Sequence, residues 1–166
     1  MAESEFPGID RRHAQPAWRR QQAVLTERVA VVAAATTVPY EIYYAATDLH
    51  AYLSVFVANL IFVSVCIAAV WLNRARRHDL ALDLMVTALY VHLFVITAFL
   101  STGPGVHLFY FALGGSLGMF FIAGREGQAA ALTLLAAALF VVCEVAFPPG
   151  STSVQVPAAV ARVMYA

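Results

Sequence analysis

The chain has 166 residues, of which 61% are hydrophobic and 12% charged, and its ten basic and ten acidic residues leave no net charge. Soluble domains carry about 25% charged residues, so this composition excludes an ordinary water-soluble protein. All ten basic residues are arginines, and they are spread along the chain rather than interleaved with aromatic residues in one patch, which argues against nucleic-acid binding.

Residues 1–23 are expected to form a cytoplasmic tail. They contain Pro7, Gly8 and Pro16 among mixed charges, and no apolar run comes before Val24. No cleavable signal peptide is therefore visible, and the first apolar span is expected to act as its own insertion signal. Residues 24–166 then form a transmembrane helical domain.

Five apolar stretches of about twenty residues follow the tail, separated by short polar breaks. The clearest covers residues 80–100, and at 1.5 Å per residue it matches the hydrocarbon layer of about 30 Å. These stretches are apolar on all sides rather than along one stripe. The predicted fold is all-α, a polytopic transmembrane helical bundle of five spans plus the start of a sixth. The predicted spans are 24–46, 51–72, 80–100, 106–123 and 128–147, with a partial sixth from about residue 156.

The arginines predict the orientation of these spans. Short breaks make neighbouring helices antiparallel. With the N-terminus in the cytoplasm, nine of the ten arginines fall in the tail, the start of the first span and the inner breaks, and none falls in the outer breaks. Because cytoplasmic loops carry an excess of arginine and lysine, we expect a multi-pass protein of the cell (plasma) membrane with a cytoplasmic N-terminus.

Three ionisable residues, Glu41, His107 and Glu144, lie near the outer ends of three different predicted spans. An ionisable side chain costs about 2.5 to 3.5 kcal/mol at the centre of a bilayer and less near its surface, so their shared depth needs a reason. We hypothesise that they form an outward-facing pocket for a divalent cation or a small polar ligand, because carboxylates and imidazoles suit both. The alternative is that each group reaches interfacial water independently. No catalytic residue and no other cofactor is expected.

Spans four and five resemble the corresponding part of the six-helix membrane domain of mycobacterial-type class III adenylate cyclases. The start of the first span, RRQQAVLTERVAVV, is similar too, and the resemblance covers most of residues 19–150. It rests on three features. An aromatic cluster, Phe109, Tyr110 and Phe111, follows a short outer loop, and residues 124–127 form a tight inner turn. A glutamate, Glu144, precedes two prolines, Pro148 and Pro149.

In that family a sixth helix leads through a signalling helix into a cytosolic catalytic domain. That domain dimerises to build its active site and uses metal-binding aspartates with Mg or Mn and ATP. This chain contains none of those catalytic residues and is expected to stop before helix six is complete. The resemblance therefore implies a membrane anchor and sensor that works as a homodimer, signals to a cytosolic cyclase effector, and is not an enzyme by itself.

Two other functions are open to a chain of this kind. A small multi-pass transporter or channel subunit is the main alternative, although no span is broken centrally by paired Gly or Pro with polar flanks. An intramembrane enzyme is less well supported, because no HExxH occurs. A cyclase domain encoded downstream would favour the sensor.

Overall fold

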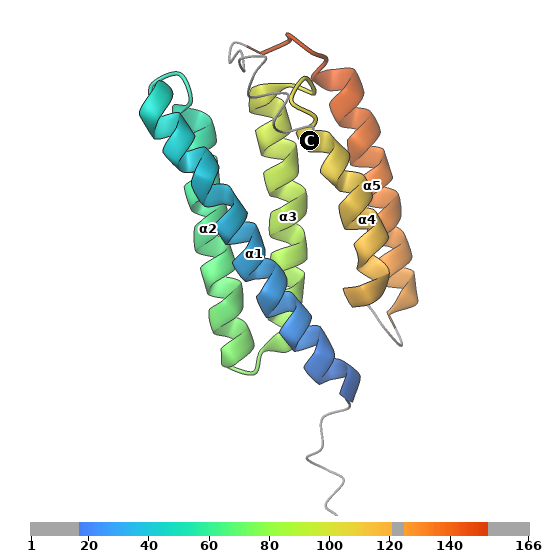
Figure 1. The fold of residues 1–166 in the computed structure, drawn as a ribbon. Helices are drawn as coiled ribbons and strands as arrows, with labels where there is room; N and C mark the ends of the chain where they lie inside the picture. Colours follow the sequence, from blue (N-terminus) through green and yellow to red (C-terminus); the bar gives the residue numbers. More distant parts are fainter. Residues whose placement is uncertain (1–16, 121–124, 153–166) are drawn as a thin grey trace, which may run out of the picture.

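The protein is described by a computed structural model that places residues 17–120 and 125–152. Every regular element among these residues is a helix, and consecutive helices run up and down through short turns, as brief polar breaks require (Figure 1). The all-helical prediction is confirmed for this part of the chain. The elements are α1 (Ala17–Thr47), α2 (Leu53–Arg74), α3 (His78–Leu100), the 3-10 helix η1 (Val106–Leu108), α4 (Phe109–Phe120) and α5 (Glu126–Ala146).

Four of these helices, α1, α2, α3 and α5, are long and apolar enough to cross a membrane. The ends of α2, α3 and α5 lie within two residues of the predicted spans. α1 begins at Ala17, so the last part of the expected tail is helical. Together with their apolar exposed side chains, these helices make the chain a multi-pass membrane protein.

The fourth predicted span, 106–123, is the one that differs. Its described part is the three-residue η1 followed by the 12 residues of α4, which extend about 18 Å, short of a bilayer core of about 30 Å. The apolar run does not become α-helical at once, because Gly105 adopts a left-handed conformation and a 3-10 turn follows it. The described residues therefore contain four candidate spans and one shorter apolar helix. Residues 121–124 and the partial sixth span lie outside the described residues.

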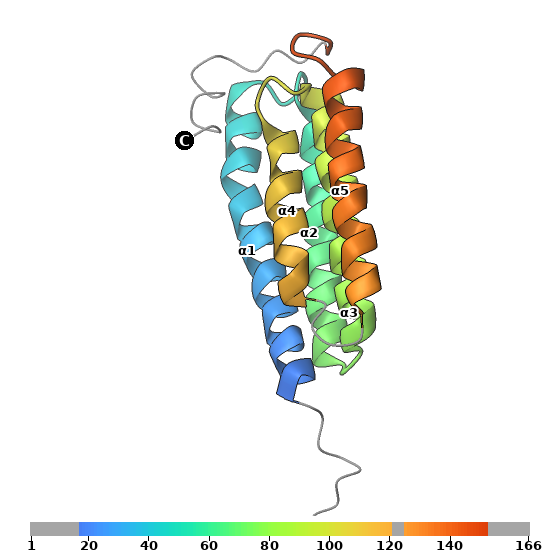
Figure 2. The same cartoon turned by 90° about the vertical axis from the view of Figure 1, so that its right-hand side faces the viewer.

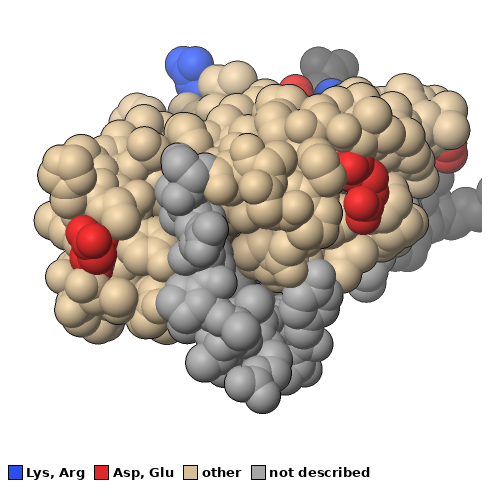
Figure 3. Space-filling view, turned by 90° about the horizontal axis from the view of Figure 1, so that it is seen from above, with Lys and Arg blue, Asp and Glu red and all other residues tan. Residues whose placement is uncertain are grey.

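The two ends of the bundle differ in composition. Every described arginine lies toward the end where α1 and α5 begin and α2 meets α3, which is the lower end in Figure 1. We call this the arginine end. The opposite end, with the α1–α2 turn and the α3–η1 loop, carries Tyr43, Tyr44 and Tyr52 and is called the tyrosine end. Seen from above, acidic side chains are scattered over the tyrosine end rather than gathered in one cluster (Figure 3).

The helices pack as two units. α1, α2 and α3 form a three-helix unit with two small apolar cores, one on each side of its middle. α4 and α5 form a hairpin that packs mainly against α3, and α4 lies between α1 and α5 in the side view (Figure 2). The core between α3 and the hairpin consists of Leu82, Val86, Tyr90, Tyr110, Leu113, Leu117, Ala136 and Cys143.

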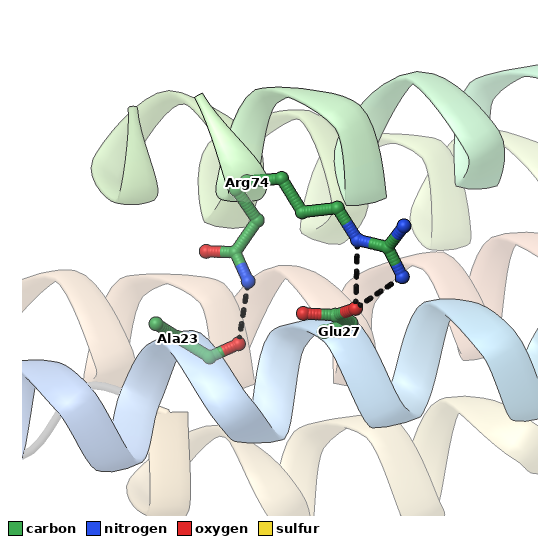
Figure 4. A network of polar contacts seen from close by, with 4 residues as sticks. Ala23, Glu27 and Arg74 are labelled. Carbon is green, nitrogen blue, oxygen red and sulfur yellow. Dashed lines mark hydrogen bonds and ion pairs between the residues drawn. The ribbon is translucent and has the colours of Figure 1, made fainter. Parts of the chain in front are cut away.

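Polar contacts fasten α1 to α2 at the arginine end (Figure 4). The buried Asn73 side chain donates a hydrogen bond of 2.8 Å to the carbonyl oxygen of Ala23, and its Oδ1 lies 2.6 Å from His78 Nδ1. Beside it, the Arg74 guanidinium donates to Glu27 Oε1 from Nε and Nη2, at 3.2 and 3.0 Å. The Arg74 side chain is 72% exposed, so this ion pair contributes less than about 1 kcal/mol.

Candidate functional site

The structure brings two of the three predicted site residues together. His107 Nε2 in η1 lies 2.7 Å from Glu144 Oε1 near the end of α5. His107 is 3% exposed and its ring stacks on Phe140 at 5.3 Å between centroids, whereas the Glu144 side chain is 45% exposed. A neutral imidazole protonated on Nε2 donates this hydrogen bond to the carboxylate. The buried His107 Nδ1 then has no hydrogen-bond partner among the described residues.

The third predicted residue, Glu41, is bonded elsewhere. Its Oε1 accepts a hydrogen bond of 2.6 Å from Asn59 Nδ2 of α2, and its buried Oε2 has no partner in the part of the chain that the structure describes. No group of three or more His, Cys, Asp and Glu side chains within residues 17–120 and 125–152 is arranged to hold a metal ion. The set Glu41, His107 and Glu144 is thus divided between two contacts, and a divalent cation at the tyrosine end stays a prediction.

Near these contacts lies a cavity of about 390 Å³ in the tyrosine half of the bundle. Its wall comes from α1, α2, α3 and the start of the hairpin. None of its lining residues is an Asp, Glu, Lys or Arg, and most of the lining is aliphatic or aromatic. The polar side chains in the wall are Thr36, Thr37, Tyr40, Tyr44, Asn59 and His92.

Two of these polar residues, His92 and Asn59, were not among the predicted site residues. His92 lies near the middle of α3 and stacks face to face on Phe62, with 4.0 Å between ring centroids. Asn59 connects the cavity wall to Glu41 through the hydrogen bond described above. The sequence signal for both is the same: a strongly polar side chain inside a largely apolar span, where such a group is costly unless something binds it.

Contacts join the hairpin to α3 at three different depths. Near the tyrosine end, the Thr102 amide and hydroxyl both donate to the carbonyl oxygen of Phe147, at 2.9 and 3.0 Å. At mid-height the Tyr90 hydroxyl donates to the Leu132 carbonyl at 2.7 Å. At the arginine end, the Arg125 guanidinium lies 3.8 Å from carboxylate oxygens of two residues on α3; these are Asp79 and Asp83. These contacts hold the hairpin against α3 along its length.

Membrane-crossing helices with a ligand-sized cavity between two packing units are the features of a membrane-bound binding domain. The model of the MASE7 family matches residues 11–166. The chain belongs to this family, which is one of membrane-associated sensory domains. No curated protein and no solved structure matches the chain.

Proposed function

We propose that this chain is the membrane anchor and sensor of a signalling protein whose cytosolic effector is a class III adenylate cyclase. The observation that carries the proposal is the position of the cavity. Its wall comes mainly from the three-helix unit, and Val106 of η1 and Phe109 of α4 add the start of the hairpin. A bound molecule that contacts both parts is expected to change how they pack against each other. MASE7 membership supports the sensory role. The resemblance over residues 19–150 supports the choice of a cyclase as effector.

The proposed orientation places the arginine end in the cytoplasm. All described arginines lie toward that end, and arginine-rich loops stay on the cytoplasmic side during insertion. The tyrosine end, with the cavity and the His107–Glu144 contact, then faces outward. A signal received at the outer side has to reach the arginine end through the helices.

The proposed working form is a homodimer, because the catalytic domains of the resembled cyclases build their active sites as dimers. α5 is the least buried of the four candidate spans, and its outer face is apolar. That face suits either lipid or a second copy of the chain. Exposed side chains on it include Leu134, Val141 and Val145.

A fusion protein tests the proposal. The chain is joined to a class III cyclase catalytic domain through the sixth helix and signalling helix of such a cyclase, and cyclic AMP formation is measured in membranes. We expect higher activity per catalytic domain than for the same domain alone, because the membrane module holds two copies together. Two results together would contradict the proposal: the fusion and the catalytic domain alone have equal activity at matched concentrations, and the fusion is monomeric in lipid nanodiscs.

A second measurement addresses the chain alone. We propose that it is not an enzyme, so the purified chain with ATP and Mn should form no cyclic nucleotide. Turnover that survives replacement of His107 and Glu144 would overturn this part of the proposal.

A further inference from the structure

We propose that the 390 Å³ cavity binds an uncharged lipophilic molecule with one small polar group, which enters from the bilayer between α1 and α4. This inference rests on the proposed function in one respect: the bound molecule is the signal that the sensor detects. The binding itself depends only on the cavity.

The cavity wall selects against charged ligands. Its apolar part includes Phe62, Leu93, Ile96 and Phe109, and no acidic or basic side chain lines it. An ion that entered would lose its hydration without gaining an opposite charge, which is unfavourable in an apolar environment. An aliphatic or aromatic body loses nothing in leaving the surrounding lipid.

One polar position in the wall selects for a hydrogen-bonding group. The His92 ring is held by stacking on Phe62, and no hydrogen bond to it is found among the described residues. A neutral imidazole carries one donor and one acceptor, so it can bind a hydroxyl in either direction. Thr36 and Thr37 already donate to the Ala33 carbonyl oxygen. Asn59 donates to Glu41, and Tyr40 and Tyr44 lie nearer the tyrosine end. His92, near the middle of α3, is therefore the expected partner of a polar group that enters deep into the cavity.

The cavity reaches the outer surface of the helices. Thr36 and Tyr40 of α1 and Phe109 of α4 line it, and all three are also exposed on the outer surface of the bundle. The opening therefore lies between α1 and α4, which are neighbouring helices in Figure 2. Its volume falls within the range of about 300 to 1,000 Å³ that is usual for small-molecule sites. A molecule already dissolved in the bilayer can enter without crossing water.

Photolabelling of the full chain in lipid nanodiscs tests this inference. The probe is decan-1-ol carrying a diazirine in its chain, and labelled residues are located by mass spectrometry. We expect saturable labelling of cavity residues that unlabelled decan-1-ol suppresses at concentrations at least tenfold lower than decane or decanoate. Labelling of lipid-facing side chains should not saturate.

Two variants and one matched control make the test specific. Ala33→Phe fills the cavity and should abolish saturable labelling, whereas Ala35→Phe, the same change on the lipid-facing side of α1, should leave it intact. His92→Phe keeps the stacking on Phe62 but removes the polar partner, so decan-1-ol should lose its tenfold advantage over decane. Thermal unfolding of each variant shows that it is folded.

Three results would overturn the inference: labelling that never saturates, equal labelling in Ala33→Phe, or stronger competition by decanoate than by decan-1-ol. The fusion protein separates this inference from the proposed function. Saturable labelling without any effect of decan-1-ol on cyclase activity supports the site and refutes its sensory role. Regulation of the fusion by another molecule that persists in Ala33→Phe supports the sensor and refutes this cavity as its ligand site.

Discussion

His107 Nε2 and Glu144 Oε1, 2.7 Å apart, join the start of the α4–α5 hairpin to its end. The two residues are 37 positions apart in the chain, and the contact lies where η1 and the end of α5 meet at the tyrosine end. The imidazole is buried and the carboxylate is partly exposed. The hairpin is thus closed at the end where the α3–η1 loop enters it.

The first prediction concerns this contact. His107→Ala and Glu144→Ala should each destabilise the chain, and a double-mutant cycle should give a coupling energy near 1.5 kcal/mol, the lower end for hydrogen bonds to charged groups because Glu144 is 45% exposed. Thermal or denaturant unfolding in detergent measures it. The control cycle pairs His107 with Glu41, which bonds to Asn59 instead, and should show no coupling.

The second prediction compares two neighbouring residues at the arginine end. Asn73→Ala removes a buried side chain that bonds to Ala23 and His78, so unfolding should become about 1 to 3 kcal/mol more favourable. Arg74→Gln removes only an exposed ion pair and should change stability by less than about 1 kcal/mol. A larger loss of unfolding free energy for Arg74→Gln than for Asn73→Ala would contradict the conclusion that Asn73 is the main polar contact between α1 and α2 at this end.

The third prediction concerns the buried tyrosine between α3 and α4. The Tyr110 hydroxyl donates a hydrogen bond of 3.0 Å to the Tyr90 carbonyl, and Tyr110 is 1% exposed. Tyr110→Phe should therefore cost about 1 kcal/mol of unfolding free energy. Tyr40→Phe, at an exposed position, is the matched control and should leave the unfolding midpoint unchanged.

The fourth prediction is the orientation. A cysteine placed at Gly103 in the α3–η1 loop should react with a membrane-impermeant maleimide in intact cells, and one placed at Gly127 should react only after the membrane is opened. The native Cys66 and Cys143 are buried and should stay unlabelled in both cases. The reverse pattern of labelling would place the arginine end outside.

The sequence predicts most of the helices because long apolar runs are visible without knowing how they pack. α2, α3 and α5 match their runs within two residues. The predicted first span begins at Val24, whereas α1 begins seven residues earlier. Gln22 and Ala23 are buried in this added part, and Asn73 donates a hydrogen bond to the Ala23 carbonyl. That contact comes from a helix fifty residues away, so no local pattern signals it. The 3-10 turn before α4 likewise depends on the backbone conformation of Gly105, which apolarity does not reveal.

The candidate site was predictable in part. Equal depth on different helices suggested that His107 and Glu144 could meet, and they do. Depth says nothing about the direction in which a helix presents its side chains. Glu41 therefore accepts a hydrogen bond from Asn59 on the neighbouring helix and does not join His107 and Glu144. The cavity could not be predicted either, because it depends on how far apart two packing units lie.

Tyr90 is hydrogen-bonded to both helices of the hairpin. Its carbonyl oxygen accepts from Tyr110 of α4, and its hydroxyl donates to the Leu132 carbonyl of α5. Tyr90 lies near the midpoint of α3, so one residue attaches both helices of the hairpin to the middle of α3. Replacing its side chain removes the bond to α5 and leaves the backbone carbonyl that accepts from Tyr110, so a single substitution separates the attachment of α5 from that of α4.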